Sequence, residues 1–189
     1  MTRIVAGLAK GRQLAVPKSG TRPTSERVRE ALFSRLEHWG YVDSAVVVDL
    51  YAGSGALGLE AASRGASTVV CVEAAQSAAR VIARNVSMTG LASVVTVNKK
   101  AQSYLRAEPG AIPEFDMALL DPPYACADDE LADTLSALAQ HMVYDGLIVV
   151  ERDKRSPEPI WAEGWELIDE WIMGDTKIWS ARRSQSLNS

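Results

Sequence analysis

From residue 45 onward, short apolar runs alternate with longer stretches whose apolar positions recur every three or four residues. The apolar runs predict β-strands at 45–50, 68–73, 93–98, 115–121 and 146–151. The stretches between them predict α-helices at about 56–64, 75–88, 101–107 and 128–142. The runs are almost continuously apolar, which is typical of parallel strands that helices cover on both faces. The pattern therefore predicts an α/β fold around a mostly parallel sheet.

Both ends of the chain depart from this alternation. Residues 165–171 and 176–181 read as two strands joined by a short turn, which predicts an antiparallel C-terminal hairpin that closes the sheet. A weaker alternation over residues 3–16 predicts a short N-terminal β-hairpin. Thr24 or Ser25 is suited to cap the helix that follows, because a side-chain oxygen there accepts hydrogen bonds from first-turn N–H groups.

The loop after the first predicted strand carries the spacing Gly53-x-Gly55-x-x-Gly58, with Asp49 just before it. Glycine allows a positive φ and lets the backbone come close to a ligand, which a Cβ atom would prevent. The N–H groups that begin the next helix then face that ligand. We interpret the stretch as a ligand-binding loop. With Glu73 closing the second strand, the glycines alone fit a nicotinamide site as well as an S-adenosylmethionine site.

A second motif, Asp121-Pro122-Pro123-Tyr124, ends a later strand and favours methyl transfer, because hydride transfer has no use for it. Asp49 also favours an S-adenosylmethionine site, since a carboxylate would repel a pyrophosphate but attract the ammonium of a methionine moiety. The Asp121 carboxylate and the Pro122 carbonyl, held by two proline rings, can accept hydrogen bonds from both N–H groups of a base amine. Tyr124 can stack on the base.

The predicted topology brings these two motifs together. Right-handed crossovers place every loop that follows a strand at the same edge of a parallel sheet, and ligands bind outside that edge. We therefore expect the loops after Leu50, Glu73, Asn98 and Asp121 to converge on one cavity.

Composition excludes several classes of protein. The chain has 189 residues, of which 47% are hydrophobic and 23% charged, as in ordinary globular proteins. It contains no apolar run of membrane-spanning length, so we expect no membrane association. Cys71 and Cys126 lie far apart without neighbouring ligand residues, so we expect no metal site and a reduced, cytoplasmic protein.

The charge distribution is uneven along the chain. Residues 1–35 carry eight basic and two acidic side chains, a net charge of +6, whereas the remainder carries −10. A basic extension on an acidic body is a candidate contact surface for a polyanion such as a nucleic acid.

The motifs together resemble the class I S-adenosylmethionine-dependent methyltransferases, and the N-terminus resembles the RsmD family in particular. That family methylates the N2 amine of one guanine in small-subunit (16S) ribosomal RNA. The residues that carry the resemblance are Arg3-Ile4-Val5-Ala6-Gly7, Gly11-Arg12-Gln13-Leu14, Pro17, Arg22-Pro23-Thr24, Arg27-Val28-Arg29-Glu30 and Phe33.

The resemblance implies a Rossmann-like, seven-stranded fold and assigns roles to individual residues. The implied cofactor is S-adenosylmethionine, which leaves as S-adenosylhomocysteine, with no metal. Its implied contacts are Asp49, Ala52, Gly53, Ser54, Gly55, Gly58, Glu73 and Ala101. The implied catalytic residues are Asp121, Pro122, Pro123 and Tyr124. The implied RNA contacts are Arg3, Arg12, Arg22, Thr24, Arg27 and Arg29.

The resemblance also implies how the chain is organised and what it acts on. We expect a basic RNA-contacting extension at 1–40, a catalytic domain at 41–183 and a frayed tail at 184–189. The implied partner is 16S rRNA within an assembling small subunit, bound by a monomer. One departure is Lys100, where the family carries Asp or Asn; lysine cannot accept a hydrogen bond from the adenine amine of the cofactor.

Three other functions remain open from the sequence. The Asp-Pro-Pro-Tyr motif serves adenine N6 as well as guanine N2, so an adenine-N6 methyltransferase of DNA or RNA is the first alternative. The glycine spacing leaves a nicotinamide-dependent oxidoreductase as the second. The third is an RNA-binding module without catalytic activity.

Overall fold

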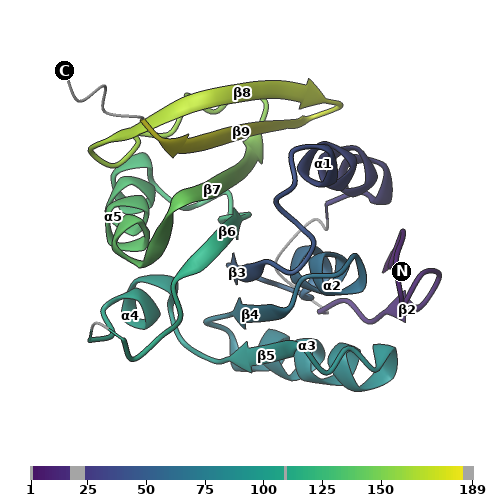
Figure 1. Ribbon diagram of the computed structural model, residues 1–189. Helices are drawn as coiled ribbons and strands as arrows, with labels where there is room; N and C mark the ends of the chain where they lie inside the picture. The colour runs from purple at the N-terminus through teal and green to yellow at the C-terminus, as the bar shows by residue number, and fades with distance from the viewer. Residues whose placement is uncertain (1, 18–23, 109, 185–189) are drawn as a thin grey trace.

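A seven-stranded β-sheet in the order β5-β4-β3-β6-β7-β9-β8 runs through the centre of the computed structural model (Figure 1). The structure describes residues 2–17, 24–108 and 110–184. The strands are β3 (Val46–Leu50), β4 (Thr68–Val72), β5 (Val94–Val97), β6 (Phe115–Leu120), β7 (Met142–Asp153), β8 (Trp165–Met173) and β9 (Thr176–Arg183). The first five in sheet order are parallel, and β9 is antiparallel to both β7 and β8. The predicted α/β fold and its C-terminal hairpin are confirmed.

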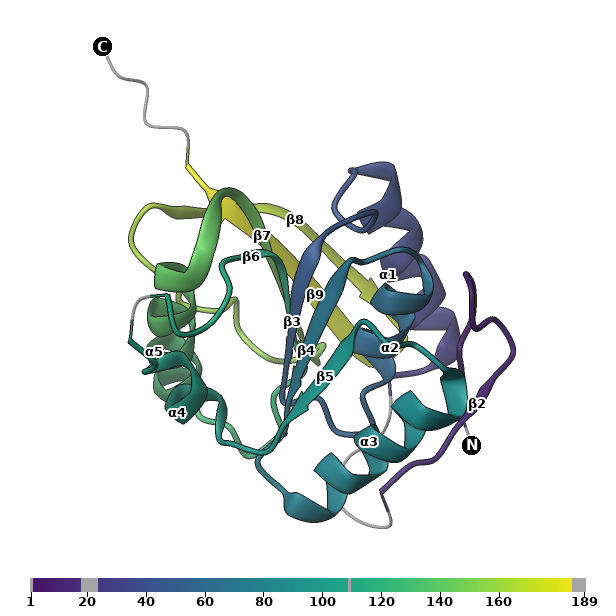
Figure 2. The same cartoon turned by 60° about the horizontal axis from the view of Figure 1, so that its bottom comes forward.

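Helices cover both faces of this sheet. They are α1 (Glu26–His38), α2 (Ala56–Ser63), α3 (Gln76–Thr89), α4 (Ala101–Leu105) and α5 (Asp128–Leu138). Figure 2 shows α1, α2 and α3 on one side of the sheet and α4 and α5 on the other. Along β3, Val47 packs into the first layer and Val48 into the second, so the strand is buried on both faces. This double burial explains the continuous apolar runs of the sequence.

Two predicted boundaries differ from the structure. The helix predicted over 128–142 ends at Leu138, and a 3-10 turn, η1 (Ala139–His141), leads directly into β7. β7 is much longer than the predicted 146–151, because its start, Met142, pairs with Phe115 of β6 and its end pairs with β9 as far as Asp153. Both differences arise from pairing with a distant strand, which local sequence does not encode.

The N-terminal segment is bound to the central domain through a buried carboxylate. Its hairpin is shorter than predicted, with two-residue strands β1 (Thr2–Arg3) and β2 (Gln13–Leu14). Glu60 on α2, which is fully buried, accepts hydrogen bonds from the backbone N–H groups of Val5 (2.8 Å) and Ala6 (3.0 Å). Ile4 and Leu14 lie in the same hydrophobic cluster as α1 and α2. The extension and the sheet domain therefore share one core.

Ser25, one of the two predicted caps, begins α1. Its hydroxyl oxygen accepts a hydrogen bond from the N–H of Val28 at 3.2 Å. Within the described ranges, no helix is long and apolar enough to cross a membrane. Most of the predicted tail, residues 185–189, lies outside the described residues.

Replacing Gly7 by alanine tests how tightly the extension is docked. A Cβ atom at Gly7 would lie 1.8 Å from the backbone oxygen of Ser63, at a φ of +78°. Gly11 has a similar φ of +81° but no atom within 4 Å of a Cβ, so Gly11→Ala is a matched control. We expect Gly11→Ala to lower the free energy of unfolding by about 1 kcal/mol through backbone strain alone.

Gly7→Ala has the same backbone strain and, in addition, a steric clash with the backbone of Ser63. We therefore expect its free energy of unfolding to fall by about 3 kcal/mol. Urea unfolding of both variants measures the difference. Equal losses in the two variants would show that the hairpin does not press against α2.

Candidate active site

Four carboxylates gather at the carboxyl edge of the sheet, one from each of four neighbouring strands. Asp49 lies in β3, Glu73 follows β4, Asp121 follows β6 and Glu151 lies near the end of β7. The ends of β3, β4 and β6 are level, because Leu50 pairs in register with both Val72 and Leu120; Leu120 pairs with Val150 of β7, which continues to Asp153. Among the residues that the structure describes, no three or more metal-ligating side chains group closely enough to hold a metal ion.

The glycine loop at the end of β3 is held from two sides. Gly53 and Gly55 both have positive φ, of 57° and 77°, as a tight turn into α2 requires. The N–H of Gly53 donates to the Glu73 carboxylate at 2.9 Å. Asn85 of α3 is buried and donates to the carbonyl oxygens of Ser54 and Ala15, each at 2.9 Å. Sequence reasoning missed Asn85, because nothing in its local pattern distinguishes it from other helical polar residues.

Gly58 packs beneath the loop and orients Asp49. It lies buried in α2, and its N–H donates to an Asp49 oxygen at 2.8 Å. A Cβ atom there would stand 2.6 Å from the sulfur of Cys71, so only glycine fits between helix and strand. Gly58 is not among the residues that line the cavity beside the loop. Gly58 therefore packs beneath the cavity, whereas the family resemblance implied that it contacts the cofactor.

Burial at this edge raises the pKa of Asp49 to about 7, and the nearby charges of Asp121 and Glu73 add to the effect, against the hydrogen bond from Gly58. A carboxylate in this state gains from a cation placed beside it, since the cation offsets both the desolvation and the repulsion. The geometry suits a ligand with a positively charged group at the glycine loop.

A small cavity of about 30 Å³ joins the two motifs. Asp49 and Asp121 both line it, together with the loop residues Ala52, Gly53 and Ser54. The predicted convergence is therefore confirmed for the glycine loop and Asp121, whereas Glu73 and Asn98, from the other two predicted loops, do not line this cavity. Val16 and Pro17 of the N-terminal segment, and also Thr24, contribute to its lining.

Ala101 lies at the start of α4, beyond the end of β5, with its side chain buried. Lys100 precedes it as an exposed residue. Asn98, in the loop between β5 and α4, donates from its amide to the carbonyl oxygens of Glu73 (2.8 Å) and Ala74 (3.0 Å). This loop is thus tied to the end of β4, where Glu73 stands, but Ala101 is not part of the small cavity.

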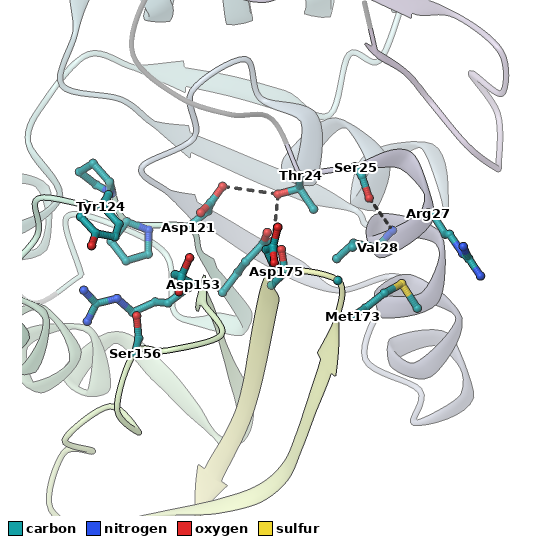
Figure 3. Close-up of a pocket in the computed structure, with 16 residues that line it drawn as sticks. Thr24, Ser25, Arg27, Val28, Asp121, Tyr124, Asp153, Ser156, Met173 and Asp175 are labelled. Atoms are coloured by element: carbon teal, nitrogen blue, oxygen red, sulfur yellow. Dashed lines mark hydrogen bonds between the residues drawn. The ribbon is translucent and has the colours of Figure 1, made fainter.

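A second cavity of about 450 Å³ opens on the other side of Asp121, between the end of β7, the β8–β9 turn and α1 (Figure 3). Its size is that of a pocket for a small molecule or a single base. Pro122 is buried at its wall, whereas Tyr124 is 85% exposed and stands at its rim. Tyr124 is available to stack on a base only because it does not pack into the core.

Thr24 connects the two acids at the centre of this second cavity. Its hydroxyl lies 2.9 Å from an oxygen of Glu151 and 3.4 Å from an oxygen of Asp121 (Figure 3). Burial raises the pKa of Asp121 to about 7. Burial, with the charge of Asp121 next, raises the pKa of Glu151 to about 8. Near neutral pH the pair therefore retains a proton that exposed carboxyl groups would have lost.

Two predicted RNA contacts are buried in the structure. Thr24 hydrogen-bonds to the carboxyl pair and lines both cavities, so it could meet only a base that enters them. Arg29 is fully buried; it pairs with Glu60 at 3.3 Å and donates to the Arg3 carbonyl. Burial lowers the pKa of Arg29, and the charge of Glu60 opposes that shift. Its function is to hold the N-terminal segment on α2. The sequence alone does not reveal this ion pair, because the partner Glu60 is distant in the chain.

The other predicted RNA contacts divide by exposure. Arg12 and Arg27 are exposed, and Arg27 also lines the larger cavity. Arg3 is exposed and pairs with Glu26 at 2.9 Å. Arg22 lies outside the described residues.

Comparison with known proteins decides the family. A family model described as "Conserved hypothetical protein 95" matches residues 2–182. Proteins named "Ribosomal RNA small subunit methyltransferase D" from Haemophilus influenzae and Escherichia coli K12 are 36% and 34% identical to this chain over 175 residues. The alignments cover 91% of the chain and 89% and 85% of the relatives. This chain belongs to the RsmD family.

Solved structures agree with this membership. The Escherichia coli protein yhhF superposes with a TM-score of 0.84 at 31% identity, covering 96% of this chain and 97% of that one. TrmN from Thermus thermophilus, at 18% identity and a TM-score of 0.69, shares the fold over 83% of this chain and 48% of its own. The RsmD-family chain thus has the class I methyltransferase fold, with its two signature motifs at one edge of the sheet.

Replacing Glu151 by glutamine tests the buried charge at this edge. The pKa of Glu151 is raised from 4.5 to about 8 in the folded protein. Between about pH 5 and pH 8 the unfolded chain has lost this proton while the folded protein still holds it, so wild-type stability falls as pH rises. Glutamine has no proton to lose. We expect the stability of Glu151→Gln relative to wild type to increase by at least about 1 kcal/mol across this range, measured by urea unfolding.

Asp153→Asn is the control on the same strand. Hydrogen bonds from Arg155 lower the pKa of Asp153 to about 2, so this carboxylate stays ionised throughout the range. Its replacement should therefore change stability by the same amount at every pH. A pH trend in Asp153→Asn as large as that in Glu151→Gln, or none in Glu151→Gln, would contradict a desolvated charge at Glu151.

Proposed function

We propose that this RsmD-family protein transfers a methyl group from S-adenosylmethionine to the N2 amine of one guanine in 16S ribosomal RNA. The relatives named above as small-subunit rRNA methyltransferases support the reaction and the class of substrate. The observation that carries the proposal is that the glycine loop and Asp121 line one cavity, so a ligand on the loop would adjoin a base held at Asp121.

The residues of the loop fit this cofactor. Asp49 and the N–H-rich turn at Gly53 would hold the methionine part, whose ammonium offsets the unfavourable burial of Asp49. Glu73 would bind the ribose hydroxyls, and Ala101 would present its backbone N–H to the adenine ring. When bound, the cofactor would supply a methyl group on a sulfonium, and the nitrogen nucleophile would displace S-adenosylhomocysteine from that methyl carbon in line.

Asp121 and the carbonyl of Pro122 prepare that nucleophile. The N2 lone pair of guanine is delocalised into the ring, and acceptors for both of its N–H groups favour a more tetrahedral nitrogen with a freer lone pair. Positive charge would develop on the nitrogen as the new bond forms, the half-buried carboxylate of Asp121 would stabilise it, and loss of an amine proton would then give the neutral product. The rest of the rate enhancement is alignment of the two reactants.

The RNA reaches this site as an unpaired or flipped base, because an exocyclic amine within a duplex is stacked and paired. The exposed cations of the extension, Arg12 and Arg27 among them, would hold the neighbouring phosphates. We place the reaction in the cytoplasm, on an assembling small subunit, with a monomeric enzyme.

Asp121→Ala tests the catalytic assignment. The variant removes one acceptor for the amine, so we expect methyl transfer to fall by about 100-fold or more. Affinity for S-adenosylhomocysteine, measured by calorimetry, should change little. Asp145→Asn is the control, since Asp145 is an exposed acid near the other end of β7. Transfer that survives in Asp121→Ala would remove Asp121 from the mechanism.

Nucleoside analysis after transfer of a labelled methyl group to methyl-deficient small subunits distinguishes the alternatives. The proposal predicts label on guanine N2. Label on adenine alone would establish an adenine-N6 methyltransferase, and binding of NAD without S-adenosylhomocysteine would establish an oxidoreductase. Binding of cofactor and RNA without any methyl transfer would indicate that the protein is an RNA-binding module without catalytic activity.

Arg12→Ala and Arg27→Ala together test the basic surface. Removing a cation that binds a phosphate reduces the number of counterions released when RNA binds. Both the affinity for RNA and the slope of its salt dependence should therefore fall, the slope by about one unit for each phosphate that is no longer bound. Arg106→Ala, an exposed residue at the end of α4 on the opposite face of the sheet, is the control. An unchanged slope in the double variant would exclude these arginines from the interface.

A further inference from the structure

Among the described residues, Glu151 is the buried acid at the edge of the sheet that neither the glycine loop nor the Asp-Pro-Pro-Tyr motif accounts for; Asp153 and Asp175 also line the larger cavity but are not buried. It lies near the end of β7, directly beyond the paired residues Leu120 and Val150, so it stands beside Asp121 across two neighbouring parallel strands. Both acids line the larger cavity, and one hydroxyl, that of Thr24, lies within hydrogen-bonding distance of each. The two carboxyl groups thus face the same space.

This arrangement is unfavourable for folding. Glu151 is only 6% exposed, and a carboxyl group buried beside another acid loses solvation and is repelled by its neighbour. A glutamine would make the same hydrogen bond with Thr24 without a charge. Residues that reduce stability in this way gather at functional sites.

Two carboxyl groups side by side, each of which keeps an acceptor oxygen even when the pair holds a proton, match the edge of guanine. The Watson–Crick edge of guanine presents the N2 amine and, next to it, the N1–H, which form a continuous row of donors. Adenine and cytosine present an amine beside an unprotonated ring nitrogen, whose lone pair a second acceptor would repel. An enzyme that takes a base out of the stack reads it through this edge.

We propose that Glu151 selects guanine by accepting a hydrogen bond from the N1–H while Asp121 and the Pro122 carbonyl bind the adjacent amine. This inference rests on the proposed function and explains why the same Asp-Pro-Pro-Tyr motif acts here on guanine N2 and not on adenine N6. Thr24 positions the two acids from the N-terminal segment, and its hydroxyl gives way to the base as the donor.

The test replaces the target guanine by 2-aminopurine, which keeps the amine at C2 but has a lone pair at N1. Small subunits are reconstituted with 16S rRNA that carries either base at the position that the wild-type enzyme methylates. At about pH 9, where Glu151 is ionised, we expect wild type to prefer guanine by about 100-fold in kcat/KM, because a buried carboxylate that can only accept then faces a lone pair in the analogue. In Glu151→Gln the amide can rotate and donate to N1, so this preference should shrink at least about tenfold.

The quantity compared is the ratio of kcat/KM for guanine to kcat/KM for 2-aminopurine, in wild type and in Glu151→Gln. This comparison cancels the other effects of the analogue, such as its missing O6 and its altered amine. Asp145→Asn should leave the ratio unchanged. Calorimetry with S-adenosylhomocysteine and a urea unfolding curve establish that Glu151→Gln is folded and binds cofactor.

The outcomes separate the two proposals. A guanine preference that is the same in wild type and Glu151→Gln, including an equal loss of activity on both substrates, would overturn the role of Glu151 and leave the proposed function intact. Absence of label from guanine with the wild-type enzyme would overturn the proposed function before any variant is compared.

Discussion

Parallel pairing of β3, β4, β6 and β7 is the constraint on which the site depends. Their pairing is in register, and each strand carries an acid close to the same edge of the sheet. The strands are buried on both faces, so their register is fixed by packing in two layers at once. A shift of one residue in β6 or β7 would turn Asp121 or Glu151 away from the cavity, and no local feature could restore it.

The same pairing concentrates negative charge where solvation is poor. Burial raises the pKa of Asp49, Asp121 and Glu151 well above the values of exposed carboxyl groups. The folded protein therefore carries a free-energy cost that no packing requirement explains. A cationic ligand at Asp49 and a row of N–H donors at Asp121 and Glu151 would each relieve part of that cost, which is how a destabilised edge becomes a binding site.

The N-terminal segment is part of this site as well as a candidate RNA surface. Glu60 and Asn85, both buried, fasten its backbone to α2 and α3, and Arg29 pairs with Glu60 from the other side. Thr24 then reaches the carboxyl pair, while Arg12 and Arg27 remain exposed. A segment anchored in this way links the surface that would hold RNA phosphates to the groups that would hold the base.

The sequence by itself determined the order of strands and helices, the doubly covered sheet and the convergence of the two motifs, because apolar periodicity, glycine spacing and the right-handed crossover are local or universal rules. It did not reveal Glu151, Asn85 or the burial of Arg29 and Thr24. Each of these residues acts through a partner that lies between 26 and 127 positions away in the chain. Only the tertiary structure decided which charged side chains met solvent and which met one another, since that choice depends on packing between distant segments and not on the identity of the residue.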